Sequence, residues 1–94
     1  MDASSAMIRA ILFFSGRVQG VGFRYNTNEI AKQFEVTGTV ENCDDGRVKI
    51  VVEGKRDTVD AFIDAIKIAM SGKIKQLDRF ETAASSEFDN FSVR

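Results

Sequence analysis

The pattern of apolar and polar positions predicts two amphipathic helices among several strands. Apolar side chains recur every three or four positions over residues 22–34 and again over residues 57–72, the spacing of a helix with one buried face. Shorter apolar or alternating segments predict strands at residues 7–15, 36–42, 47–53, 74–82 and 88–93. The first of these strands carries apolar residues at both odd and even positions, which is typical of a central strand covered on both faces.

Local signals indicate where the elements turn and begin. Asp44-Asp45-Gly46 lies between two expected strands and predicts a hairpin turn. Asp57 with Asp60 resembles a capping pair at the start of the second helix. We expect residues 1–6 to form a disordered leader, so the single predicted domain covers residues 7–94.

The order of the expected elements defines the fold class and a meeting point for functional groups. The order β-α-β-β-α-β predicts a ferredoxin-like α+β sandwich, with an antiparallel sheet and two helices on one face. A helix that connects the first two strands makes them parallel, so both strands end at the same edge of the sheet. Arg24, at the start of the first helix, and Asn42, at the end of the second strand, should therefore converge at that edge.

The loop between the first strand and the first helix has the composition of an anion-binding site. Three glycines, Gly16, Gly20 and Gly22, fall within seven positions and allow the backbone to approach a ligand closely. The helix N-terminus that follows directs amide donors at the same point. Arg24 lies in the first helical turn, where its guanidinium can bind two oxygens of one anion. This combination predicts a phosphoryl site; the alternative is a turn that only reverses the chain, with Arg24 in solvent.

The loop differs from both common glycine-rich phosphate motifs. A P-loop needs Lys and then Ser or Thr after its last glycine, but Phe23 and Arg24 stand there. A dinucleotide-binding motif needs a glycine at the position of Tyr25. We therefore expect backbone amides and one arginine to hold the phosphate, without a metal or other cofactor.

Composition argues against several classes of function. The chain of 94 residues contains no histidine, which removes the commonest general base and metal ligand. Its net charge of −1 gives no electrostatic case for nucleic acid, and the strands lack the aromatic run of an RNA-binding domain of the same layout. No segment is long enough to span a membrane. The single cysteine, Cys43, fits a reducing compartment, so we expect a cytoplasmic protein. We also expect a monomer.

A longer pattern connects the loop to a known family. The motif Gly16-Arg17-Val18-Gln19-Gly20-Val21-Gly22-Phe23-Arg24 is followed by Gly38-x-Val40-x-Asn42 and Asp45-Gly46-x-Val48. This pattern resembles the acylphosphatase family, small enzymes that hydrolyse carboxyl phosphates, over about residues 8 to 66. The other matching positions are Thr27, Ala31, Arg47, Glu53, Gly54, Val59 and Phe62.

The resemblance implies roles for individual residues. Arg24 would bind the phosphate of a small acyl phosphate, and Asn42 would orient the attacking water through its side-chain amide. The backbone amides expected to assist Arg24 are those of Val18, Gln19, Gly20, Val21, Gly22 and Phe23. In-line attack on phosphorus would release a carboxylate and inorganic phosphate, with the substrate phosphate accepting the proton. The alternative is a non-catalytic module that binds phosphate or carbamoyl groups, as in hydrogenase maturation proteins.

Three positions depart from the family pattern. Thr39 stands where most members have Trp, and Glu41 where a basic residue is usual. Glu35 replaces the glycine that commonly ends the first helix in a left-handed conformation. None of these changes removes a catalytic group, so we expect them to alter rate or substrate affinity.

Overall fold

A computed structural model describes residues 6–94, and the predicted leader up to residue 5 lies outside the described residues. Every expected helix and strand is present. The elements in chain order are β1 (Met7–Gly16), α1 (Phe23–Ala31), β2 (Thr37–Asn42), β3 (Val48–Lys55), α2 (Arg56–Ala69), β4 (Ile74–Ala83) and β5 (Phe91–Val93).

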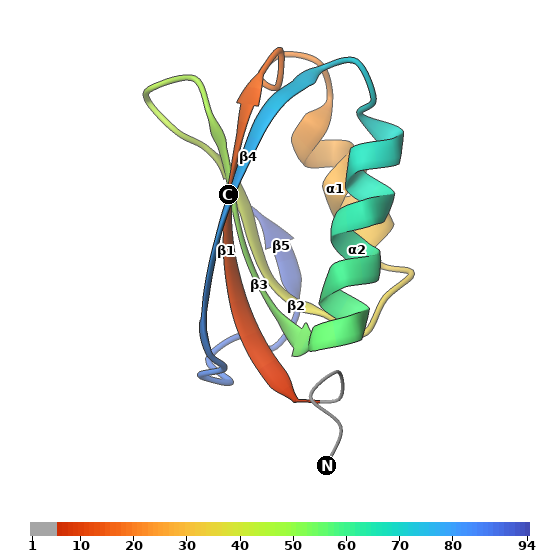
Figure 1. The fold of residues 1–94 in the computed structure, drawn as a ribbon, viewed down its shortest axis with the longest axis vertical. Helices are drawn as coiled ribbons and strands as arrows, with labels where there is room; N and C mark the ends of the chain where they lie inside the picture. The colour runs from red at the N-terminus through yellow and green to blue at the C-terminus, as the bar shows by residue number, and fades with distance from the viewer. Residues whose placement is uncertain (1–5) are drawn as a thin grey trace.

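The strands form one sheet in the order β4-β1-β3-β2-β5, and both helices cover the same face of it (Figure 1). β1 pairs antiparallel with β3 and β4, and β2 pairs antiparallel with β3. The ferredoxin-like α+β fold is therefore confirmed. The sheet is mixed in one detail, because the three-residue β5 runs parallel to β2. β4 ends at the edge where β2 begins, so a strand that follows after a short crossing runs in the same direction as β2.

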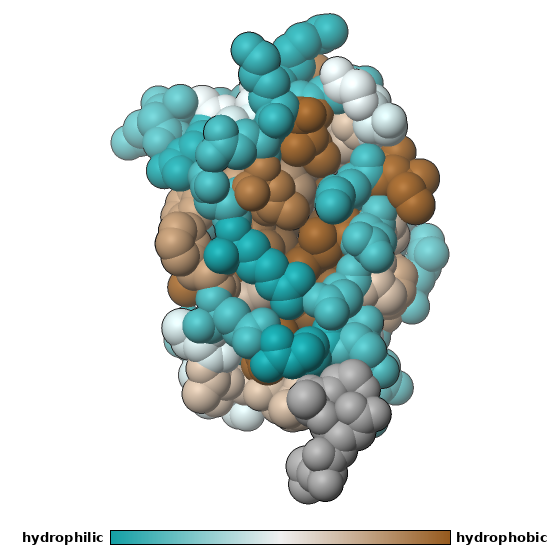
Figure 2. All heavy atoms as spheres, in the orientation of Figure 1, coloured by the Kyte–Doolittle hydropathy of each residue, from teal (hydrophilic) through white to brown (hydrophobic). Residues whose placement is uncertain are grey.

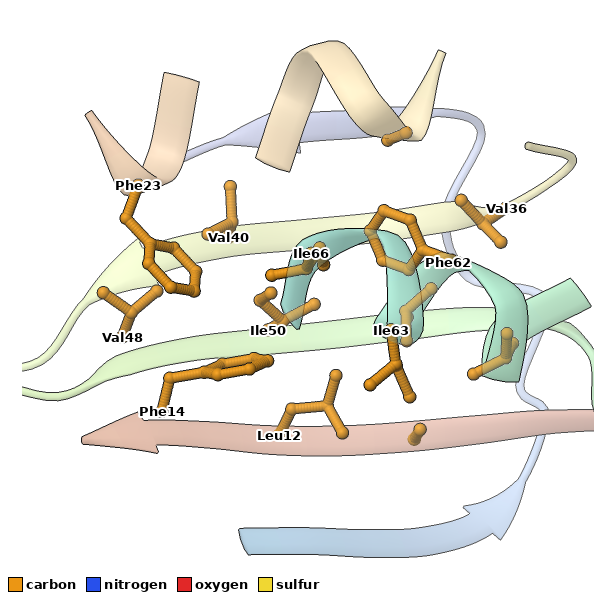
Figure 3. Packing of buried hydrophobic residues seen from close by; sticks show 14 of the residues in the cluster. Leu12, Phe14, Phe23, Val36, Val40, Val48, Ile50, Phe62, Ile63 and Ile66 are labelled. Carbon is orange, nitrogen blue, oxygen red and sulfur yellow. The ribbon is translucent and has the colours of Figure 1, made fainter. Parts of the chain in front are cut away.

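The core lies between the sheet and the two helices (Figure 3). Leu12 and Phe14 of β1 and Ile50 of β3 are buried on the sheet face that carries the helices, where apolar side chains of α2 also pack. Each fully buried side chain of this size contributes about 1.5–3 kcal/mol relative to an exposed one. The apolar residues at both odd and even positions of β1 predicted cover on both faces of the strand. The helices cover only one face, and the residues of the other face are half-buried or exposed.

Phe23 connects the core to the start of α1. Its ring is buried and lies 5.1 Å from the ring of Phe14, centroid to centroid. Thr27 and Ala31 continue the buried face of the helix, one turn apart. The first turn of α1, which carries Arg24, is therefore held against the end of the sheet by an anchored aromatic side chain.

Both helices end earlier than the apolar pattern predicts. After Ala31 the amides of residues 32–34 donate to carbonyls three residues back, so this stretch is a tight turn that reverses the chain toward β2. Glu35 does not adopt the left-handed conformation of the family's glycine; Ser86 is the one non-glycine residue with a positive φ among residues 6–94. A side chain in the left-handed conformation would be strained, and Glu35 avoids that strain. α2 ends at Ala69, three residues before Gly72.

The predicted capping pair of α2 is wrong. The N-cap residue is Lys55, which makes no side-chain capping bond, and Asp57 lies in the first turn. Asp60 instead forms an ion pair with Arg79 of β4 at 2.8 Å, and Arg56 pairs with Glu81 at 2.6 Å. Figure 2 shows hydrophilic residues that run across apolar surface on the side of the molecule where α2 and β4 lie.

Candidate functional site

The predicted site residues meet at the edge of the sheet where β1 and β2 end, at the top of Figure 1. A cavity of about 350 Å³ opens there between the glycine loop, the first turn of α1 and the end of β2. Its lining residues are Val18, Gly20, Gly22, Phe23, Arg24, Tyr25, Asn42 and Val93. Arg24 and Asn42, which are 18 positions apart in sequence, therefore line one cavity, as the topology predicts.

Two predicted loop residues lie outside the cavity lining. Val21 is half-buried and packs against the hydrophobic core. The side chain of Gln19 turns toward the β2–β3 hairpin, as described below. The cavity also contains two residues that the sequence analysis did not single out, Tyr25 and Val93. Both are among the exposed large apolar side chains, and no local pattern distinguishes them from ordinary surface residues.

The backbone of the loop leaves its amides free for a ligand. Gly22 is the N-cap of α1 with φ 81°, a left-handed conformation that a side chain would strain, and no side chain caps the helix. Among residues 6–94, no backbone carbonyl accepts a hydrogen bond from the amides of residues 18–23. The N-terminus of α1, with the positive end of its dipole, and the loop residues Val18, Gly20 and Gly22 lie at this cavity, which suits an anion.

Arg24 is half-buried, and its guanidinium is already oriented. Its Nη1 donates a hydrogen bond of 2.8 Å to the main-chain oxygen of Arg94, just beyond β5. The amide of Arg94 in turn donates to the carbonyl of Val40 on β2. No carboxylate side chain within residues 6–94 forms an ion pair with Arg24. The hydrogen bond to Arg94 uses one guanidinium nitrogen, so the other donors of Arg24 can bind an anion.

Asn42 ends β2 and is exposed at the wall of the cavity. It lies opposite Val48 in the antiparallel pairing with β3. The hairpin predicted at Asp44-Asp45-Gly46 is present directly after it, closed by a 2.8 Å bond from the Cys43 amide to the Arg47 carbonyl. Asn42 is therefore placed by a regular strand on one side and a tight turn on the other.

The side chain of Gln19 makes a contact that the sequence did not indicate. Its Nε2 donates to the carbonyl of Cys43 at 2.8 Å and to the carbonyl of Arg47 at 2.9 Å. These acceptors are 24 and 28 residues away, so no local periodicity could reveal them. The bonds join the middle of the glycine loop to the hairpin that carries Asn42.

Comparison with known proteins agrees with this arrangement. The model of the acylphosphatase family matches residues 10–93. The chain belongs to the acylphosphatase family. An acylphosphatase of Nostoc sp. is 54% identical over 59 residues, which cover 63% of this chain and 58% of that relative. The matched segment thus spans less than two thirds of that relative's length.

Other acylphosphatases match over more of their length. An acylphosphatase of Enterococcus faecalis is 44% identical over 80 residues, covering 83% of this chain and 88% of that protein. The crystal structure of an acylphosphatase from Bacillus subtilis superposes with a TM-score of 0.85 at 33% identity. That superposition covers 93% of this chain and 98% of the other.

Two of the three departures from the acylphosphatase pattern, Thr39 and Glu41, lie on β2 near the site but outside its lining. Thr39 is nearly buried opposite Val51, and Glu41 lies opposite Lys49 on β3. Both have the parity opposite to Val40, a core residue, so their side chains belong to the sheet face away from the helices. Neither lines the cavity.

Other groups that could carry chemistry are poorly suited to it. Burial raises the pKa of the Cys43 thiol, and the Asp45 carboxylate adds to the effect, so the thiol stays protonated near neutral pH. In the described part of the chain there is no cluster of three or more His, Cys, Asp or Glu able to hold a metal ion.

Within residues 6–94, neither helix has the length and apolar character needed to cross a bilayer.

Proposed function

We propose that this acylphosphatase-family protein hydrolyses acyl phosphates to a carboxylate and inorganic phosphate. The observation that carries the proposal is the shared cavity, which is lined together by Arg24, by residues of the glycine loop and by Asn42. Membership of the family supports the same reaction.

Arg24 and the loop would hold the phosphoryl group. One guanidinium nitrogen is bound to the Arg94 main-chain oxygen, so the side chain loses little conformational freedom when an anion arrives. The amides of residues 18–23 and the helix N-terminus would bind the other phosphoryl oxygens. Phosphoryl transfer depends mainly on positioning and on stabilising the charge of these oxygens, which is what this donor set supplies.

Asn42 would position the water. Its side-chain amide carries both a donor and an acceptor, so it can orient a water molecule for in-line attack. A bond forms between the water oxygen and phosphorus while the bond from phosphorus to the acyl oxygen breaks. The electron pair leaves with the carboxylate, and a phosphoryl oxygen accepts the proton of the water. A carboxylate is a good leaving group, so this route requires no general base from the protein, which suits a chain without histidine.

We also propose that the active form is a metal-independent cytoplasmic monomer. The proposed route needs no cation from the protein, and the one cysteine fits a reducing compartment. Size-exclusion chromatography tests the oligomeric state: a dimer at assay concentration would overturn this part of the proposal.

Hydrolysis of benzoyl phosphate, with and without EDTA, tests the proposed reaction. We expect turnover that EDTA leaves unchanged. Asn42→Ala should lower kcat by about 10²-fold or more while inorganic phosphate still inhibits competitively, because the water is misplaced but the anion site is kept. Asn90→Ala, an exposed asparagine outside the cavity, is the matched control and should behave as wild type. Absence of wild-type turnover, or an Asn42→Ala variant with normal kcat and only a raised KM, would contradict the mechanism.

A further inference from the structure

We propose that the side chain of Gln19 is a positioning residue that holds the phosphate loop at a set distance from Asn42. The catalytic part of this inference rests on the proposed function. The inference adds a role for the side chain of Gln19, which does not line the cavity and does not touch the reacting atoms in the proposed mechanism.

The two carbonyls bound by Gln19 flank Asn42 closely. Cys43 follows Asn42 directly, and Arg47 precedes Val48, the residue opposite Asn42 on β3. The amide group of Gln19 therefore contacts both strands of the hairpin one position beyond the pair that contains Asn42. A shift of the hairpin relative to the loop would break one of these bonds or both.

The loop has no alternative backbone connection to the hairpin. Within residues 6–94, no backbone hydrogen bond joins residues 18–22 to residues 42–48; the bond from the Arg17 amide runs to Lys73 at the start of β4. The buried Val18 ties the loop to the core, but apolar contacts are not directional. Directional fixing of the loop against Asn42 thus falls to the two hydrogen bonds from Gln19.

The chemistry of the contact requires a primary amide of this length. A glutamine NH₂ group has two protons, and both are used on carbonyl oxygens. A carboxylate in the same place would put negative oxygens against two carbonyls, and a methionine would leave both carbonyls without this donor. Misplacing a reacting group by about 1 Å can lower the rate by about 10²-fold, so loss of the bonds should affect the chemical step.

A double-mutant cycle tests the inference, using Gln19→Met, Asn42→Ala and the combined variant. If Gln19 acts by holding the loop against Asn42, Gln19→Met should lower kcat for benzoyl phosphate by about 10-fold or more and change the inhibition constant of inorganic phosphate less than about 3-fold. In the Asn42→Ala background the same change should lower kcat less than about 2-fold, because the water is already misplaced. Gln33→Met, an exposed glutamine after α1, is the matched control.

A second measurement separates this inference from the proposed function. Hydrogen exchange of the hydrogen-bonded amides of Cys43 and Gly46 should be faster in Gln19→Met than in Gln33→Met, with unchanged exchange in β1. Unchanged exchange at these two amides, unchanged kcat, or an equal loss of kcat in both backgrounds would overturn the positioning role. Absence of turnover in the wild type would overturn the proposed function and the catalytic part of this inference, whatever the exchange rates.

Discussion

Replacing Glu53 with glutamine removes a buried charge from the sheet face opposite the helices. Glu53 lies on β3, is 3% exposed, and accepts hydrogen bonds from the segment that leads from β4 to β5. Its Oε2 accepts from Arg9 Nε at 2.7 Å and from the Ser85 amide and hydroxyl at 3.0 and 2.8 Å. Its Oε1 accepts from the Ser86 amide at 2.9 Å. The carboxylate thus fastens the segment before β5 to the sheet.

These bonds determine the size of the expected effect. Burial by itself raises the pKa of Glu53, but the bonds from Ser85, Arg9 and Ser86 outweigh it and lower the pKa from 4.5 to about 2. That shift corresponds to about 3 kcal/mol of unfolding free energy at neutral pH, since one pKa unit is worth about 1.4 kcal/mol. The side chain is almost fully buried, so screening by solvent reduces this value little. Glutamine keeps one acceptor oxygen and turns an NH₂ group toward donors, so we expect Glu53→Gln to lose about 2–3 kcal/mol at pH 7.

Urea denaturation between pH 7 and pH 2 measures the effect. Because the folded pKa lies below the unfolded value, the stabilisation is fully present above about pH 4.5 and is lost as the pH falls toward 2. The difference between wild type and Glu53→Gln should therefore be largest at neutral pH and shrink below pH 4.5. Glu29→Gln, which removes an exposed pair with Lys32, is the control and should change stability by less than about 0.5 kcal/mol. A Glu53→Gln variant as stable as wild type at pH 7, or a difference that stays constant down to pH 2, would refute the reasoning.

Substitutions at three other positions test the site and its support. Arg24→Lys keeps the charge but loses the planar pair of donors, and Arg24→Ala loses both, so each should lower kcat/KM for benzoyl phosphate by about 10²-fold or more with little loss of stability. Wild-type turnover by Arg24→Ala would disprove the proposed phosphate site. Glu41→Lys replaces a negative charge near the site by a positive one, so it should raise kcat/KM a few-fold at low ionic strength, mainly through KM, and the gain should shrink as salt screens the charge. Identical kinetics for Glu41→Lys and wild type at both low and high salt would show that Glu41 has no electrostatic influence on the site. Gly38→Ala should lower the unfolding free energy by about 3 kcal/mol or more in urea denaturation, because Gly38 has φ 145° and a Cβ there would overlap the Val51 carbonyl. A loss below about 1 kcal/mol would show that β2 can relax around the added methyl group.

The sequence by itself determined the secondary structure and the location of the site. Apolar spacing identified both helices and all five strands, because the periods of 3.6 and 2 record which face of each element is buried. The connection of two strands by a helix then required β1 and β2 to end at one edge of the sheet. For this reason the sequence alone predicted that Arg24 and Asn42 lie near each other. Boundaries were less accurate: residues 32–34 continue the apolar pattern of α1, but the chain has to reverse there to enter β2.

The tertiary structure alone decided which distant groups bond to one another. The Asp57–Asp60 spacing looks like a helix cap, yet Asp60 pairs with Arg79 on another element. In the same way, Arg24 is oriented by a main-chain oxygen 70 residues away, Gln19 by two carbonyls of the hairpin, and β5 by its parallel pairing with β2. Each of these contacts depends on distance and direction between elements, whereas a local pattern records only burial along one element. The sequence therefore determined where the candidate site residues meet, and the packed fold determined which contacts hold them.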